Sequence, residues 1–309
     1  MTIKHFNFVG KKNIFFAISC IIIAIIIIVS LVFGVPMDVQ FKGGSIITYS
    51  HTGTIDFEEM ESFIEKTINE RVRIDEKKGI AGKDSFDIVL ASTEGLNAEK
   101  QATLTAELAK KYGNQLEFLA NSSVDPVIGK EFLFKGLLAV GLASLIIVIY
   151  VAFRFKKING LSAGVTAVVA LFHDVIIVFG TFVIFRIPLD DNFIAVVLTI
   201  LGFSINDTII IYDRIRENKK LYGKKLAIGE LVNNSINETL SRTLNTAICV
   251  LATMVIVCVV AVASGVSSIL SFSLPLMVGL VSGSYSTIFI AGPLWVMWQN
   301  HKTKKLNKA

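Results

Sequence analysis

Six long apolar segments alternate with polar stretches along the chain, and each is long enough to cross a bilayer as a helix. A helix needs about 20 predominantly apolar residues to span a hydrocarbon core about 30 Å thick. The sixth segment is long and contains Pro275, which predicts an irregular or interfacial start. The segments cover residues 14–33, 136–153, 161–185, 193–212, 243–263 and 269–298. The pattern predicts a polytopic α-helical membrane protein with six transmembrane helices.

The stretch between the first two apolar segments, residues 34–133, has the pattern of a water-soluble domain. Alternating apolar positions predict strands, amphipathic positions predict helices, and their order along the chain is β-α-β-β-α-β. That order is typical of a ferredoxin-like α+β domain. Asp56, with Glu59 three residues later, predicts an N-cap and capping box for the first helix of this domain, and Asn97 predicts a cap for the second.

Lys and Arg side chains gather on alternate loops. They precede the first apolar segment, separate the second from the third and the fourth from the fifth, and fill the tail at 301–309. By the positive-inside rule, residues 1–13 and 301–309 are cytoplasmic and the soluble domain is extracytoplasmic. The helices then occupy 14–33 and 134–300. The first apolar segment lacks an A-x-A cleavage site, which favours an uncleaved anchor over a signal peptide.

Two further features are expected at the cytoplasmic face. The basic, periodically apolar segment 213–240 predicts an amphipathic helix on the inner membrane surface, with a solvated loop as the alternative. Trp295 and Trp298 are expected in the aromatic belt of the inner interface.

Composition supports the membrane class and argues against an enzyme. Of the 309 residues, 18% are charged, against about 25% in soluble domains. The three cysteines lie in apolar segments without C-x-x-C spacing or a neighbouring histidine cluster, so neither a zinc site nor a disulfide is predicted. No nucleophile–base constellation or phosphate loop is present, so neither covalent catalysis nor a cofactor is expected.

The most informative polar residues are Asn206 and Asp207, inside the fourth apolar segment. A carboxylate at this depth costs about 2.5–3.5 kcal/mol on insertion scales, so it is typical of sites that transfer protons or ions. Arg242 opens the fifth segment from the same side of the membrane, and the two charges would meet if the two helices are adjacent. They would then form a proton relay, because a small movement of the Arg would change the protonation of the acid. The alternatives are that Asp207 only holds two helices together, and that Arg242 snorkels or pairs with Glu238.

Two other groups lie within the apolar segments. His173 and Asp174 occupy the middle of the third segment and form either part of the relay or a structural pair. Ser282, Gly283 and Ser284 belong to a small, hydroxyl-rich seam in the sixth segment, which favours close helix packing over a pathway.

Six motifs in order along the chain resemble the SecD/SecF protein-export family, within the resistance-nodulation-division superfamily, and its SecF subunits in particular. The most specific are GFSINDTIIIYDRIREN at 202–218 and NSINETLSRTL at 234–244. The others are FKGGS at 41–45, VDPVIGKE at 124–131, LFHDVII at 171–177 and GLVSGSYSTIFIAGPL at 279–294. Asp125 stands where the family usually has Gly, and Lys156-Lys157 stand where it usually has an acid.

The resemblance implies a function in protein export. The expected protein lies in the bacterial cytoplasmic membrane as a subunit of an export complex. Its expected partners are a SecD-like subunit, the SecYEG channel, unfolded preprotein and membrane lipids, and not nucleic acid. The proton gradient would be its energy source for late steps of translocation. The resemblance assigns Asp207 to the family's intramembrane acid and Arg242 to its basic residue.

Two rival functions remain open from the sequence. The first is half of a resistance-nodulation-division exporter for lipids or drugs, which would need a second half as partner. The second is a passive membrane scaffold. Whether the coupling ion is H⁺ or Na⁺ is also open.

Overall fold

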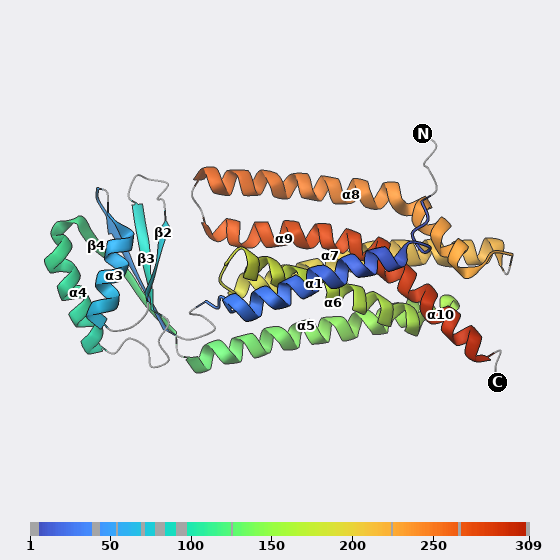
Figure 1. Cartoon of the computed structure of the whole chain (residues 1–309), viewed down its shortest axis with the longest axis horizontal. Coiled ribbons are helices and arrows are strands. Elements are labelled where there is room, and N and C mark those ends of the chain that lie inside the picture. The colour runs from blue at the N-terminus through green and yellow to red at the C-terminus, as the bar shows by residue number, and fades with distance from the viewer. Residues whose placement is uncertain are drawn as a thin grey trace.

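The computed structural model describes residues 6–38, 44–53, 55–68, 72–77, 84–90, 98–124, 126–223, 225–264 and 267–306. It confirms six helices long and apolar enough to cross a membrane, in a chain that folds as a small sheet domain at one end of a helix bundle (Figure 1). The positions of Phe41, Lys42 and Gly43 of FKGGS, of Asn97 and of Asp125 lie outside the described residues.

The bundle helices are continuous and exceed the predicted apolar segments at several ends. Their bounds are α1 Lys12–Phe33, α5 Pro126–Arg154, α6 Gly160–Ile184, α7 Asp191–Tyr222, α8 Ile228–Ser264, α9 Ser267–Ser286 and α10 Gly292–Leu306. A short 3₁₀ turn, η2 Lys156–Ile158, joins α5 to α6, and a π-helical turn, η3 Thr287–Ala291, joins α9 to α10. The sixth span, Ile269–Thr303, runs through α9, η3 and α10.

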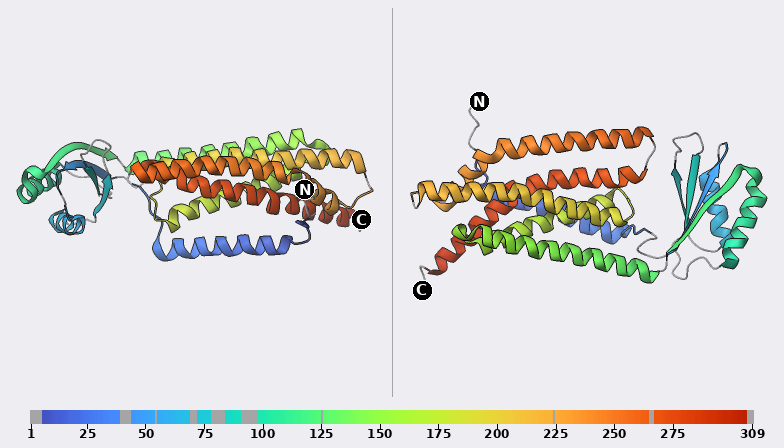
Figure 2. Two further views of the ribbon diagram at one scale, coloured as in Figure 1. Left: turned by 90° about the horizontal axis from the view of Figure 1, so that it is seen from above. Right: turned by 180° about the vertical axis from the view of Figure 1, so that it is seen from behind.

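The sheet domain confirms the predicted β-α-β-β-α-β order. Its elements are β1 Gly44–His51, α3 Phe57–Ile68, β2 Val72–Lys77, β3 Asp84–Leu90, α4 Ala98–Tyr112, the 3₁₀ turn η1 Gly113–Gln115 and β4 Leu116–Val124. The strands pair antiparallel in the order β2-β3-β1-β4. Figure 2 shows α3 and α4 on one face of the sheet, where Ile47, Phe86 and Ile88 are fully buried against Met60 and Leu104.

Asp56 caps α3 as predicted. Its Oδ1 accepts the backbone N–H groups of Glu58 and Glu59, each at 3.1 Å. These are two of the four donors that the first turn of a helix leaves without an intrahelical partner. The Glu59 carboxylate accepts a 2.8 Å hydrogen bond from Lys111 at the end of α4, which ties the two helices together.

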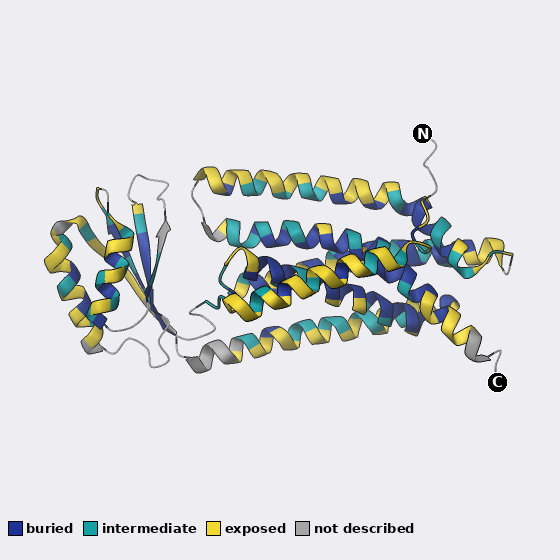
Figure 3. Ribbon diagram, in the orientation of Figure 1, coloured by how far each residue is buried: buried dark blue, intermediate teal, exposed yellow. Residues whose placement is uncertain are grey.

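Burial separates the bundle into inner and outer helices. At least half of the apolar window of α6, α7 and the sixth span is buried, against about a tenth or less for α1, α5 and α8. The exposed faces of the outer helices carry large apolar side chains, such as Ile28 and Leu31 of α1 (Figure 3). A membrane protein needs apolar residues on its lipid-facing side, whereas polar groups must be satisfied inside. Functional polar residues are therefore expected on the three inner helices.

The segment 213–240 was predicted as one amphipathic helix, and the structure corrects this. α7 continues to Tyr222 and ends at Gly223, whose φ of +57° suits a helix end. α8 begins at Ile228, so the segment is the tip of a helical hairpin at the end of the bundle away from the sheet domain (Figure 1). Across this hairpin Arg214 of α7 pairs with Glu238 of α8 at 2.6 Å, which directs these two charges toward each other.

The structure also contradicts the irregular start expected for the sixth span and the interfacial position expected for Trp295. α9 is regular through Pro275, and the irregular turn lies at Thr287–Ala291 instead. Trp295 is 1% exposed and donates its indole N–H to Ser162 Oγ at 3.2 Å, so it packs inside the bundle and not in an interfacial belt. Ser162 supplies the hydrogen-bond acceptor that a buried indole needs, a partner that hydropathy does not reveal.

Candidate functional site

The polar centre of the bundle is built around Asp174, on the inner helix α6. Its side chain has no exposed surface and accepts hydrogen bonds from three serine hydroxyls. Ser282 on α9 donates to Oδ1 at 2.6 Å, while Ser204 on α7 and Ser286 at the end of α9 donate to Oδ2 at 2.8 and 2.7 Å. His173 Nδ1 lies 3.2 Å from Oδ1. One carboxylate thus joins the three inner helices.

This arrangement favours the structural interpretation of Asp174. A buried carboxylate is tolerated when hydrogen bonds replace its lost hydration. His173 is less completely satisfied: its ring centroid lies 5.9 Å from that of Tyr285, and its buried Nε2 has no hydrogen-bond partner among the described residues. Tyr285 in turn donates its hydroxyl to Phe15 O at 2.8 Å, which connects the centre to α1.

The small-residue seam of α9 packs closely against α7. A Cβ placed on Gly283 would lie 3.1 Å from the Cβ of Ser204, and one on Gly279 would lie 2.7 Å from Ile200 Cδ1. Glycines four residues apart let two helix backbones approach closely. Ser282 uses this proximity to reach Asp174. Ser284 is buried, but its hydroxyl has no partner among the described residues.

Asp207 lies on α7 three residues after Ser204, one helical turn along the same face. Like Asp174 it is 0% exposed. Unlike Asp174, both of its carboxylate oxygens lack a hydrogen-bond partner among the described residues. A buried carboxylate in this condition carries a large desolvation cost in its charged form. The two acids of the inner helices therefore differ: Asp174 accepts three hydrogen bonds from serines, and Asp207 accepts none from the described residues.

Arg242 reaches the same region from α8, which packs directly against α7. The fourth and fifth spans are therefore adjacent, which is the condition under which the two charges could meet. Arg242 exerts a coulombic attraction on Asp207, although no ion pair within 4.0 Å joins them among the described residues. Its side chain is exposed, as is that of Asn206. Asn206 therefore points out of the bundle, away from the buried face that holds Asp207.

Glu238 binds two side chains of α7. Its Oε2 accepts hydrogen bonds from Arg214 Nε at 2.6 Å and from Asn218 Nδ2 at 2.7 Å, both on α7. Arg214 also pairs with Glu217 at 2.8 Å. This cluster ties α8 to the end of α7.

Sequence patterns alone did not assign Ser204 to a site, and they placed Ser286 and Thr287 only in the packing seam of the sixth segment. Ser204 lies one turn before Asp207 and Ser286 one turn after Ser282, so i,i+3 and i,i+4 spacing was the available signal. Thr287 Oγ1 lies 3.0 Å from Thr208 Oγ1 and donates to Ser204 O at 3.3 Å. These contacts extend the polar centre from Asp174 toward the turn of α7 that carries Asp207.

Comparisons with known proteins agree with this architecture. The family described as "Protein export membrane protein SecD/SecF, C-terminal" matches residues 104–301. The chain is 33% identical over 306 residues to protein translocase subunit SecF of Anaerolinea thermophila, with 95% of this chain and 94% of that protein covered. It is 33% identical over 305 residues to protein translocase subunit SecDF of Bacillus subtilis, with 98% of this chain but 39% of that protein covered.

Solved structures give the same result. The crystal structure of SecDF from Thermus thermophilus matches 96% of this chain with a TM-score of 0.78 and 32% identity, over 39% of that chain. A SecDF structure in a super-membrane-facing form matches 100% of this chain with a TM-score of 0.70 and 32% identity, over 41% of that chain. The chain thus spans about two fifths of these SecDF chains and nearly the full length of the SecF relative. With its six spans and sheet domain, it is a multi-pass membrane protein that belongs to the SecD/SecF family of protein-export membrane proteins.

Proposed function

We propose that this protein is a SecF-like, non-enzymatic subunit of a protein translocase, and that proton transfer at Asp207 and Arg242 drives its working cycle. The translocase role is supported by the names of its relatives and by near full-length similarity to a SecF subunit. The main support for the relay is that Asp207 is fully buried and has no hydrogen-bond partner among the described residues. The cation Arg242 lies on the neighbouring helix α8 and attracts it.

Two opposing effects act on Asp207. Burial favours the neutral carboxyl, and the positive charge of Arg242 favours the carboxylate. A change in the spacing of α7 and α8 alters the balance, so protonation and helix position are coupled. A membrane potential supplies about 2.3 kcal/mol per charge per 100 mV, which is enough to bias two conformations of a bundle.

A SecD-like chain is the proposed partner. Asn206 and Arg242 are exposed, although both lie on helices that cross the membrane. A polar or charged side chain facing acyl chains is costly, so a second membrane protein is expected to cover it. Relatives that carry both parts in one chain, such as the SecDF of Bacillus subtilis, fit this arrangement.

The remaining parts of the proposal concern the membrane and the channel. The ends of the bundle remote from the sheet domain carry the excess of Lys and Arg, which favours a cytoplasmic location for both chain ends in a bacterial inner membrane. The sheet domain then faces outward, where unfolded preprotein would leave the SecYEG channel.

Translocation into inverted membrane vesicles that hold the complete complex tests the relay. We expect Asp207→Asn to abolish the gain in translocation that a proton gradient gives. Asp191→Asn, at the exposed first residue of the same helix, is the matched control and should retain that gain. Ionophores that collapse only the H⁺ or only the Na⁺ gradient identify the coupling ion. Full gradient-dependent stimulation of Asp207→Asn would contradict the relay.

Two outcomes would favour the rival functions. Purification with a second copy of the chain, and without a SecD-like subunit, would support half of a lipid or drug exporter. Proton flux in liposomes that is equal for wild type and Asp207→Asn would support a passive scaffold.

A further inference from the structure

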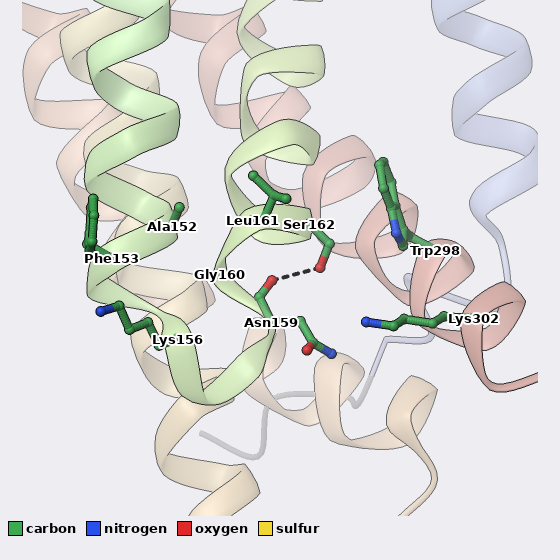
Figure 4. A pocket seen from close by; sticks show the side chains of 9 residues that line it. All are labelled: Ala152, Phe153, Lys156, Asn159, Gly160, Leu161, Ser162, Trp298 and Lys302. Atoms are coloured by element: carbon green, nitrogen blue, oxygen red, sulfur yellow. Dashed lines mark hydrogen bonds between the residues drawn. The ribbon is translucent and has the colours of Figure 1, made fainter. Parts of the chain in front are cut away.

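A hollow of about 420 Å³ opens where α5, α6 and α10 meet, at the end of the bundle remote from the sheet domain. Its floor is a close contact between α5 and α6, where a Cβ on Gly160 would overlap the carbonyl oxygen of Ala152. Figure 4 shows two kinds of lining side chain at different levels. Phe153, Leu161 and Trp298 lie toward the bundle, and Lys156, Asn159 and Lys302 lie toward its end.

The apolar level of the hollow belongs to the lipid-facing surface. Phe153 is 66% exposed, Leu161 67% and Trp298 46%. These side chains lie near the ends of membrane-spanning helices, where an indole ring suits the boundary between acyl chains and headgroups. Together they form an open apolar wall along one side of the hollow.

The polar part of the hollow contains two lysine side chains, Lys156 and Lys302. Lys302 extends toward Asn159 from α10, and Lys156 lies on the other side of the hollow, 4.7 Å from the Phe153 ring centroid (Figure 4). Neither ammonium forms an ion pair with any residue that the structure describes. Arg154 differs, since it pairs with Asp213 at 3.3 Å. The hollow is therefore a cationic site beside an apolar wall.

The frame of the site is fixed by three hydrogen bonds, which are buried or partly buried. Asn159 adopts a left-handed conformation with φ of +63°, and its Nδ2 donates to Gln299 Oε1 at 2.7 Å. Gln299 Nε2 donates to Ser162 Oγ at 2.7 Å, and Ser162 donates to Asn159 O at 2.7 Å. This cycle holds the start of α6 against α10. The distance between the two lysine-bearing elements is thereby set before any ligand arrives.

We propose that this hollow binds an anionic phospholipid, with the phosphate near Lys156 and Lys302 and an acyl chain along Leu161 and Trp298. Basic pockets between membrane helices suit anionic headgroups, and each Lys or Arg near the surface contributes about 1 kcal/mol. A second hollow shares Trp298 and Lys302 and continues along Leu294 and Met297, which gives room for a second acyl chain. The bound lipid would link α5 to α10 and stabilise the corner of the bundle.

Native mass spectrometry of the purified full chain, titrated with phosphatidylglycerol or phosphatidylcholine, tests the proposal. We expect one phosphatidylglycerol to remain bound at lipid concentrations at which phosphatidylcholine is lost. The double variant Lys156→Gln/Lys302→Gln should bind phosphatidylglycerol roughly ten- to thirtyfold more weakly. Lys220→Gln/Lys225→Gln, which removes the same charge from the exposed α7–α8 hairpin, should bind as wild type does.

Three results would overturn the proposal. The first is equal affinity of the wild type for the two lipids. The second is equal loss of phosphatidylglycerol from both double variants, since net charge and not the hollow would then determine binding. The third is displacement of the lipid by inorganic phosphate at millimolar concentration, which would assign the hollow to a soluble anion. Weaker phosphatidylglycerol binding by Trp298→Ala, with its lysines intact, would support the acyl-chain groove.

Discussion

Ser282 on α9 donates a 2.6 Å hydrogen bond to Asp174 on α6, in the centre of the bundle where both residues are buried. Ser204 and Ser286 donate to the same carboxylate. Replacing Asp174 by Ala would remove the acceptor of the buried Ser204 and Ser282 hydroxyls, while Ser286 could still donate to Gly283 O. We expect Asp174→Ala to lower the free energy of unfolding by about 3 kcal/mol, because each unsatisfied buried polar group costs about 1–3 kcal/mol. Thermal unfolding of the purified protein in detergent measures the loss.

Ser284 provides the matched control for this network. It lies in the same seam and is buried, but its hydroxyl has no hydrogen-bond partner among the described residues. Ser284→Ala should therefore leave the melting temperature unchanged or raise it slightly. A loss for Ser284→Ala as large as that for Asp174→Ala would mean that the seam is sensitive to any change and that the hydrogen bonds are not decisive.

The second prediction concerns the close contact of α9 with α6 and α7. A Cβ at position 279 would lie 2.7 Å from Ile200 Cδ1 and 2.8 Å from Val178 Cγ2. Gly279→Ala should destabilise the protein by about 1–3 kcal/mol, the usual cost of overpacking. Gly141→Ala on the outer helix α5 is the comparison, because a Cβ there meets nothing within 4 Å. It should be neutral or stabilise by up to about 1 kcal/mol through helix propensity. Equal melting temperatures for the two variants would contradict the packing argument.

Hydropathy and the spacing of apolar residues were sufficient to predict the six spans and the order of strands and helices in the sheet domain. The residue types at positions 56 and 59 were sufficient to predict the Asp56 cap. These features depend on residues close together in the chain. The sequence also identified Asp207, Arg242, His173 and Asp174 as unusual, because an ionisable group in an apolar segment stands out by composition alone.

Partners across helices could not be predicted in the same way. Glu238 precedes Arg242 by one helical turn, yet it binds Arg214 and Asn218 on another helix. Trp295 resembled an interfacial residue because its pairing with Ser162 joins positions 133 residues apart. The hairpin of α7 and α8 was missed because a basic amphipathic pattern fits both a membrane surface and two paired helix ends.

The third prediction is a pH dependence at Asp190, which precedes α7 at the end of the bundle near the sheet domain. Burial raises the pKa of this carboxyl to about 6, and the nearby charges of Asp191 and Asp38 add to the rise, while Asn192 opposes it with a hydrogen bond at 2.7 Å. A raised pKa means that the folded protein holds the proton more tightly than the unfolded chain does. Stability from this group is therefore present below about pH 4 and falls as the pH rises to about 6.

Asp190→Asn removes this titration and keeps an oxygen that can accept from Asn192. We expect the difference in melting temperature between the variant and wild type to grow from pH 4 to pH 7, with the variant more stable at pH 7. The effect should be on the order of 1 kcal/mol, since the group is partly exposed and solvent screens its charge. A difference that stays constant across this range would contradict the assignment.

The fourth prediction concerns the segment before α1, which is held against α8. Phe6 N donates to Asn237 Oδ1 at 3.0 Å, and Asn237 Nδ2 donates to Phe6 O at 2.9 Å. Phe8 N is held separately by Asn233 Oδ1 at 2.8 Å, and its ring is buried 5.6 Å from that of Phe289. Asn237→Ala should therefore free the amide of Phe6 while that of Phe8 keeps its own acceptor. Hydrogen exchange at Phe6 should accelerate about tenfold, the equivalent of about 1.4 kcal/mol. Asn245→Ala, an exposed change further along α8, should leave both amides unchanged. Equal acceleration at Phe6 and Phe8 would mean that the segment opens as one unit and is not held by two independent contacts.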